Sequence, residues 1–134
     1  MDHYRSDINV VKRLIKEWKQ YKNLVIAYDF DNTVYDYHGE GHTYHDVIEL
    51  LRNCKAYGAT LVVFTANNED KYPFIINYLK SNNIPYDYIN ETPRNIPVKS
   101  KNKIYYNILL DDRAGLSAAY KNLSMALYCM LKEI

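Results

Sequence analysis

The chain has 134 residues, of which 48% are hydrophobic and 25% are charged, and its formal net charge is +1. This length and composition are typical of one globular domain with its own core, so we expect a single domain over residues 1–134. A near-neutral charge excludes nucleic-acid or membrane binding driven by net charge alone, although it leaves a local basic groove open. The chain carries no apolar signal core and no run of membrane-spanning length, so we expect a soluble cytoplasmic protein without a membrane partner. Cys54 and Cys129 lack metal-ligand spacing and are interpreted as free thiols.

The first predicted element is an amphipathic helix over residues 7–21. Ser6 or Asp7 can cap it, and one stripe at three- and four-residue spacing is apolar: Ile8, Val11, Leu14, Ile15 and Trp18. The other faces carry lysine and arginine. We interpret them as the solvated side of a helix that covers a sheet, in preference to a nucleic-acid surface.

An apolar run over residues 24–28 predicts the opening strand and leads into Asp29 and Asp31. Residues 34–42 contain two glycines among aromatic and polar residues, which predicts a short hairpin or flap. Thr43 is expected to cap a helix over residues 44–57, which Gly58 ends. The histidines nearby are interpreted as exposed: His38, His42 and His45.

Residues 59–65 predict a second strand, and a helix capped by Asn67 or Asn68, with Pro73 near its start, follows it. Residues 86–89 predict a third strand, residues 90–103 an irregular loop, and residues 104–110 a fourth strand. A final helix is expected over about residues 115–133. This alternation predicts a three-layer α/β sandwich, with a central parallel sheet and helices on both faces.

Polar residues follow three of the predicted strands. Asp29 and Asp31 close the first, Thr65 the second, and Asp111 and Asp112 the fourth. Proteins with an open parallel sheet usually bind their ligands beyond the carboxyl ends of the strands. An extended chain points Asp29 and Asp31 to the same side, where two carboxylates repel each other, so a divalent metal ion between them is the simplest explanation.

This order of motifs resembles that of the haloacid dehalogenase superfamily. The motifs are, in chain order, Asp29-Phe30-Asp31-Asn32-Thr33, Thr65, a lysine and Asp111-Asp112. The resemblance covers about residues 24–115, the expected catalytic core, and implies a Rossmann-like fold and an Mg²⁺-dependent phosphatase. The matching role for Asp29 is the nucleophile that forms an aspartyl-phosphate, and for Asp31 the general acid and base. The resemblance implies that Mg²⁺ binds the Asp29 carboxylate, the Asp31 carbonyl and Asp111, with Asp112 reached through water.

The resemblance also implies supporting roles. Thr65 would bond a phosphoryl oxygen, and Thr33 would brace the nucleophile loop. Lys103 is the preferred catalytic lysine and Lys101 the second choice, with Lys99 also competing for the role.

Three further residues are candidates for contact with the substrate, and two of them have a second interpretation. Asn67 is either a helix cap or a substrate contact, and Arg94 could recognise a second phosphate. Arg113 could do the same, or it could brace the acidic pair.

Larger members of this superfamily insert a cap domain after the flap or between the threonine and the lysine. Here the flap runs straight into a helix, and residues 66–102 are used by one helix, one strand and a loop. We therefore expect no cap domain and an open site. Such a site suits a nucleotide, a nucleic-acid end or another large phosphorylated substrate, or an oligomer that shields it. A binding or regulatory module without turnover is the alternative, whereas a receiver-type signalling domain has its motifs in a different order.

Overall fold

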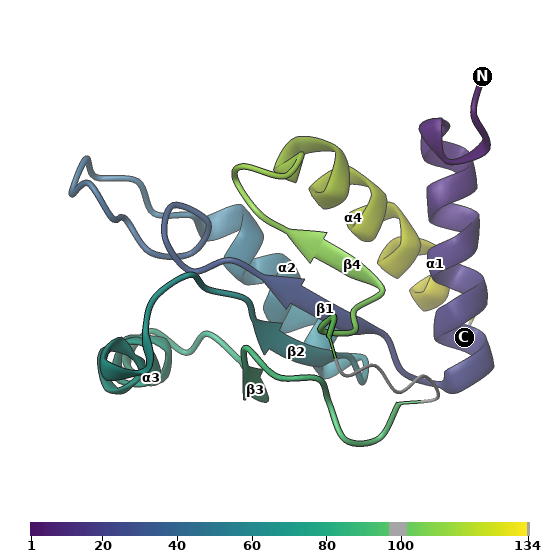
Figure 1. Ribbon diagram of the computed structural model, residues 1–134. Coiled ribbons are helices and arrows are strands. Elements are labelled where there is room, and N and C mark those ends of the chain that lie inside the picture. Colours follow the sequence, from purple (N-terminus) through teal and green to yellow (C-terminus); the bar gives the residue numbers. More distant parts are fainter. Residues whose placement is uncertain (97–101, 134) are drawn as a thin grey trace.

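A computed structural model describes residues 1–96 and 102–133 of the chain. Four parallel strands form one sheet in the order β3-β2-β1-β4: β1 is Val25–Tyr28, β2 is Thr60–Val63, β3 is Tyr88–Ile89 and β4 is Ile108–Leu110. The helices are α1 (Asp7–Tyr21), α2 (His45–Ala56), α3 (Tyr72–Ser81) and α4 (Leu116–Lys132), with short 3₁₀ turns at His3–Arg5 and Glu69–Lys71. None of the described helices is long and apolar enough to span a membrane. The prediction of an α/β fold with a central parallel sheet is confirmed (Figure 1).

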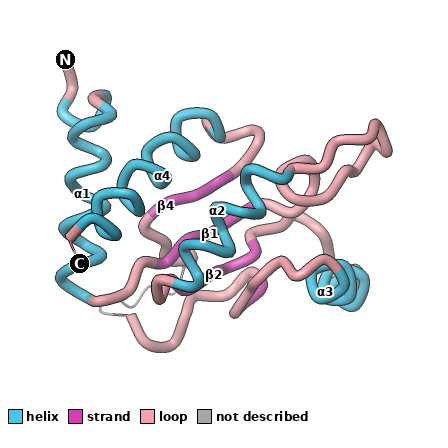
Figure 2. The backbone as a smooth tube through the Cα atoms, turned by 180° about the vertical axis from the view of Figure 1, so that it is seen from behind, coloured by secondary structure: helices cyan, strands magenta, loops and turns pink. Residues whose placement is uncertain are grey.

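The helices gather on one face of the sheet. Strand side chains that alternate along β1, β2 and β4 form one cluster with side chains from all four helices, among them Trp18, Leu51, Leu79 and Leu123, each at most 1% exposed. Figure 2 shows α2 and α4 in front of the sheet in the view from behind. Full burial of one such side chain contributes about 1.5–3 kcal/mol, so this cluster accounts for much of the stability.

The opposite face is covered differently from our expectation of helices on both faces. Val25, Ala27 and Val62 point to this face and pack against Phe64, Tyr88 and the segment that joins β3 to β4, through Ile96, Ile104, Tyr105 and Tyr106. The strand order explains this. The connections from β1 to β2 and from β2 to β3 cross the sheet in one direction, and the connection from β3 to β4 crosses it in the other. Because crossovers between parallel strands are right-handed, connections that run in opposite directions lie on opposite faces of the sheet. The described part of the returning segment is irregular, so the third layer is formed by its side chains.

Most element boundaries agree with the pattern in the sequence, and the differences have local causes. Helix α1 has the predicted bounds, although the hydroxyl of its N-cap residue Ser6 makes no capping bond. Tyr44, with φ of 53°, is the N-cap of α2, and Thr43 only accepts the His45 N–H at 3.4 Å. Gly58, with φ of 96°, ends α2 as predicted.

All four predicted strands are shorter in the structure, the fourth by the most, and the hairpin is absent from the described chain. The fourth strand begins at Ile108, because residues 104–106 lie across the second face of the sheet instead of pairing at its edge. Residues 36–41 form a turn, in which the Gly39 N–H bonds the Asp36 carbonyl and the Gly41 N–H bonds the Asp36 carboxylate. The flap therefore has no strand pair of its own.

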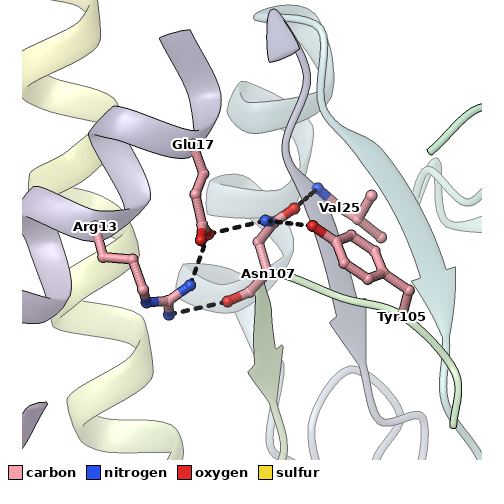
Figure 3. Close-up of polar contacts among 5 residues, drawn as sticks. All are labelled: Arg13, Glu17, Val25, Tyr105 and Asn107. Carbon is pink, nitrogen blue, oxygen red and sulfur yellow. Dashed lines mark hydrogen bonds and ion pairs between the residues drawn. The ribbon is translucent and has the colours of Figure 1, made fainter. Parts of the chain in front are cut away.

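A closed polar network fixes the amino end of the sheet (Figure 3). The Asn107 side chain accepts the Val25 N–H at 2.7 Å and donates to Glu17 at 2.9 Å and to the Tyr105 hydroxyl at 3.2 Å. Arg13 donates to Glu17 at 2.7 Å and to the Asn107 carbonyl at 3.0 Å. Since Asn107 is only 9% exposed, these bonds satisfy a buried amide and attach α1 to the first residues of β1 and β4.

Candidate active site

The carboxyl ends of β1, β2 and β4 meet at one edge of the sheet, and the predicted site residues follow them. Tyr28 is paired with Leu110 on one side and with Val63 on the other, so Asp29 and Asp111 are the next residues on neighbouring strands. The Asp29 N–H donates to the Leu110 carbonyl at 2.9 Å, which continues the ladder by one bond. In Figure 1 the strand arrows point toward this edge, where the flap also projects. The register of the parallel strands therefore places the acids together.

Three carboxylates form a compact cluster at this edge. One oxygen each from Asp29, Asp111 and Asp112 lies within 4.8 Å of the others. Burial, a hydrogen bond with Asp112 and the charges of Asp111 and Asp112 together raise the pKa of Asp29 from 3.8 to about 7. Hard oxygen ligands at this spacing fit a divalent cation such as Mg²⁺.

The turn after Asp29 holds a threonine against this cluster. Residues 30–35 close a tight turn, in which the Phe30 carbonyl accepts the Tyr35 N–H at 3.0 Å and Asn32 has φ of 60°. The Thr33 hydroxyl is fully buried, lies 3.3 Å from an Asp29 carboxylate oxygen and accepts the Asp112 N–H at 3.2 Å. One side chain thus connects the segment after β1 with the segment after β4, which is the contact expected of a bracing residue.

Asp31 lies outside the three-acid cluster and is held by an asparagine instead. The Asn67 amide donates to the Asp31 carboxylate at 3.1 Å and to the Thr65 hydroxyl at 2.8 Å. Asn67 is therefore part of the site, and Asn68 is the N-cap of the 3₁₀ turn, without a side-chain capping bond. The two aspartates of the opening motif have different environments, which agrees with different chemical roles.

Asn90 is a positioning residue that the sequence reasoning missed. Its side chain accepts the Thr65 N–H at 2.8 Å and donates to the Thr65 carbonyl at 2.7 Å, so it fixes the backbone of Thr65 on both sides. It also donates to the Tyr72 hydroxyl at 2.8 Å. The signal was present in the sequence, because Asn90 directly follows the third strand just as the other polar residues follow theirs.

A cavity of about 420 Å³ opens in front of the acids. Its wall includes all four aspartates and Asn67, and it is completed by residues of the turn, the flap and the strand ends: Asn32, Tyr37, His38, Phe64, Ala66 and Arg113. Tyr37 and His38 were not predicted to take part. His38, His42 and His45 are exposed as expected, and among them only His38 lies on this wall.

The predicted basic residues are placed unequally. Arg113 lies on the cavity wall, and its backbone N–H donates to the Asp111 carboxylate at 2.9 Å. Lys103 and Arg94 are exposed and are not part of this wall. Lys99 and Lys101 lie outside the described residues, so the choice of catalytic lysine stays a prediction.

Comparisons with known proteins show a similarity of fold and nothing beyond it. No protein-family model matches the chain, and no curated protein matches it. The structure of a conserved protein from Bacteroides thetaiotaomicron is similar with a TM-score of 0.60 and 15% identity, over 84% of this chain and 93% of that one. The crystal structure of a target protein from Vibrio cholerae has a TM-score of 0.44 and 18% identity, over 81% of this chain and 98% of that one. The first similarity supports the α/β architecture.

Proposed function

We propose that this protein is an Mg²⁺-dependent phosphate monoester hydrolase that acts through an aspartyl-phosphate. The observation that carries the proposal is the convergence of Asp29, Asp111 and Asp112 from two neighbouring strand ends, beside a separately held Asp31. The order of these residues resembles the haloacid dehalogenase superfamily, and we propose membership of it. The three carboxylates repel one another, so a bound divalent cation would stabilise this arrangement.

The nucleophile in this proposal is the Asp29 carboxylate. One of its oxygens attacks phosphorus, the bond from phosphorus to the ester oxygen breaks, and the product is an aspartyl-phosphate. The raised pKa of Asp29 means that it is partly protonated near neutral pH in the protein alone. Asp29, Asp111 and Asp112 would hold Mg²⁺, whose positive charge would keep the Asp29 carboxylate ionised and offset the charge of the phosphoryl group.

Asp31 is the proposed proton carrier. In its protonated form it would donate to the departing ester oxygen, and in its ionised form it would then take a proton from the water that attacks the aspartyl-phosphate. The Asn67 amide orients the Asp31 carboxylate and the Thr65 hydroxyl by donating to both. Thr65, whose backbone Asn90 fixes, would donate its hydroxyl to a phosphoryl oxygen.

Hydrolysis of p-nitrophenyl phosphate tests the proposal. We expect turnover with Mg²⁺, loss of turnover with a chelator, and a decrease of at least about 10³-fold for Asp29→Asn. Asp2→Asn is the matched control, because Asp2 is exposed at the amino terminus and should retain activity. Turnover without any divalent metal, or wild-type turnover by Asp29→Asn, would contradict the proposal. No turnover of any phosphate ester would favour the binding or regulatory module.

A further inference from the structure

A second hollow, which the proposed chemistry does not use, lies beside the acid cavity. It has a volume of about 340 Å³ and shares Asp31, Tyr37 and Asn67 with the acid cavity. The rest of its wall is mostly apolar: Phe30, Tyr35, Phe74 and Ile75, with Lys71 as its one described cation. The three shared residues place the two hollows next to each other. We define this second space as the aromatic hollow.

The floor of the aromatic hollow is a rigid set of rings. Phe30 is 1% exposed and stacks on Tyr35 with ring centroids 4.9 Å apart and an interplanar angle of 13°. Tyr78 meets both rings edge-on, at 5.7 Å from Phe30 and 4.8 Å from Tyr35. These contacts fix the rings before any ligand arrives, so a flat ligand would lose little binding energy to reorganisation of the protein.

Two rings of the hollow keep large exposed surfaces. Phe74 is 49% exposed although it contacts Phe30 and Tyr35 edge-on, and Tyr37 is 59% exposed. A single exposed aromatic ring needs no explanation. Here, however, two exposed rings border a hollow that shares Asp31, Tyr37 and Asn67 with the proposed site of phosphoryl transfer. Proteins commonly bind nucleobases by stacking them on aromatic side chains of this kind.

The polar rim narrows the choice of ligand. A phenyl ring has no polar edge, whereas a nucleobase presents hydrogen-bond acceptors in the plane of its ring. The Lys71 ammonium, exposed at the start of α3, is a donor suited to such acceptors. The hollow is also lined on the side of the acids by the polar residues Asp31 and Asn67, where a sugar with hydroxyl groups would connect the base to the phosphate.

We infer that the substrate is a nucleotide, with its base stacked in the aromatic hollow and its phosphomonoester in the acid cavity. The inference rests on the proposed function and adds the chemical class of the substrate. The base contributes binding through Phe74 and Tyr37, and Lys71 contacts its polar edge. A free nucleotide and the terminal nucleotide of an oligonucleotide share this chemistry.

The test compares substrates that carry the same phosphomonoester. We expect kcat/KM for a nucleoside monophosphate to exceed that for glycerol phosphate by about tenfold or more, since stacking of one base is worth about that factor. Phe74→Leu keeps an apolar side chain and removes the ring, so the ratio of the two kcat/KM values should fall about fivefold or more toward one. Tyr128→Ala removes an equally exposed ring from α4 and should leave the ratio unchanged.

Other substrates and a binding measurement separate the outcomes. A phosphotyrosine peptide hydrolysed in preference to nucleotides would overturn the assignment of a nucleobase. The values of kcat/KM for a mononucleotide and for a phosphorylated oligonucleotide show which of these two substrates the protein prefers. Calorimetric titration of Asp29→Asn with adenosine monophosphate should give binding that Phe74→Leu weakens in the same background.

Failure of the inference differs from failure of the proposed function. Equal rates for nucleotide and glycerol phosphate, both unaffected by Phe74→Leu, would overturn the aromatic hollow as a base site and leave the phosphatase intact. Absence of turnover for every ester in the presence of Mg²⁺ would overturn the phosphatase and the substrate class together.

Discussion

The two ends of the sheet treat charge in opposite ways. At the amino end, the Arg13 guanidinium lies between Glu17 and the Asn107 carbonyl, and the Asn107 amide uses both its oxygen and its nitrogen in hydrogen bonds (Figure 3). At the carboxyl end, three carboxylates face one another, and the pKa of Asp29 rises to about 7. The hydrogen bonds at the amino end stabilise the fold, whereas the carboxylates at the carboxyl end of the sheet repel one another.

This difference is the one expected between polar groups that serve the fold and polar groups that serve the proposed function. Buried polar groups that serve the fold are satisfied by their neighbours, because each unsatisfied group costs free energy. In the proposed function, a bound cation compensates these like charges, and a raised pKa such as that of Asp29 is frequent at functional sites. If the distinction is right, substitutions at the carboxyl end change activity, and substitutions at the amino end change stability.

The largest expected effect is on activity at the carboxyl end. Asp111→Asn removes one charge from the proposed metal site, so kcat/KM should fall by about 10²-fold or more at a fixed low Mg²⁺ concentration. The measurement is a Mg²⁺ titration of p-nitrophenyl phosphate hydrolysis, in which the variant should need more metal. Its urea midpoint without metal should be equal to or above that of the wild type. A loss of stability together with activity would show that Asp111 serves the fold instead.

The next effect is on stability at the amino end. Asn107→Ala leaves the buried Val25 N–H without its acceptor and also removes the bonds to Glu17 and Tyr105. We expect the free energy of unfolding to fall by about 2–4 kcal/mol, measured by urea denaturation. Asn102→Ala is the matched control, since Asn102 is exposed. The rate of hydrolysis by folded Asn107→Ala should be unchanged, and a selective loss of kcat would break the proposed contrast.

A smaller effect concerns the pH dependence of the metal-free protein. The pKa of Asp29 is raised in the fold from 3.8 to about 7, so ionisation opposes folding and stability is lost as pH rises between these values. The shift sets a ceiling of about 4 kcal/mol, and partial exposure reduces it to about 1–2 kcal/mol. Asp29→Asn should therefore equal the wild type near pH 4 and exceed its stability by this amount at pH 8.

Thermal melts with a chelator across this pH range measure the difference. Added Mg²⁺ should restore stability to the wild type at pH 8 and act less on the variant. Identical pH profiles for the two proteins would show that the acids at the carboxyl end do not strain the fold.

The smallest effect is expected for Arg13→Lys. The side chains of Arg13 and Glu17 are each 29% exposed, and lysine can retain the ion pair while it loses the fork that reaches the Asn107 carbonyl. The free energy of unfolding should fall by less than about 1 kcal/mol. A cost as large as that of Asn107→Ala would mean that the guanidinium, and not the amide, holds the amino end together.

The sequence was sufficient for the order of the helices and sheet strands and for the position of the acids after strands. Helix α1 has the predicted bounds because its apolar stripe packs into the core, apart from Ile8, which is 66% exposed. Gly58 ends α2 because it adopts a positive φ. The fourth strand was predicted four residues too long, since an apolar run shows burial but not the partner that buries it. Ile104, Tyr105 and Tyr106 are apolar because they cover the second face of the sheet.

The sequence by itself determined that Asp29, Thr65 and Asp111 follow strands of a parallel sheet, because strand length, apolar runs and turn residues are local properties. Only the tertiary structure decided which side chains meet. The register of β1 with β4 brings Asp29 to Asp111 and Asp112, and the positions of Asn67 and Asn90 around Thr65 depend on strands and loops distant in the chain. These contacts arise from packing, which no pattern along one segment encodes.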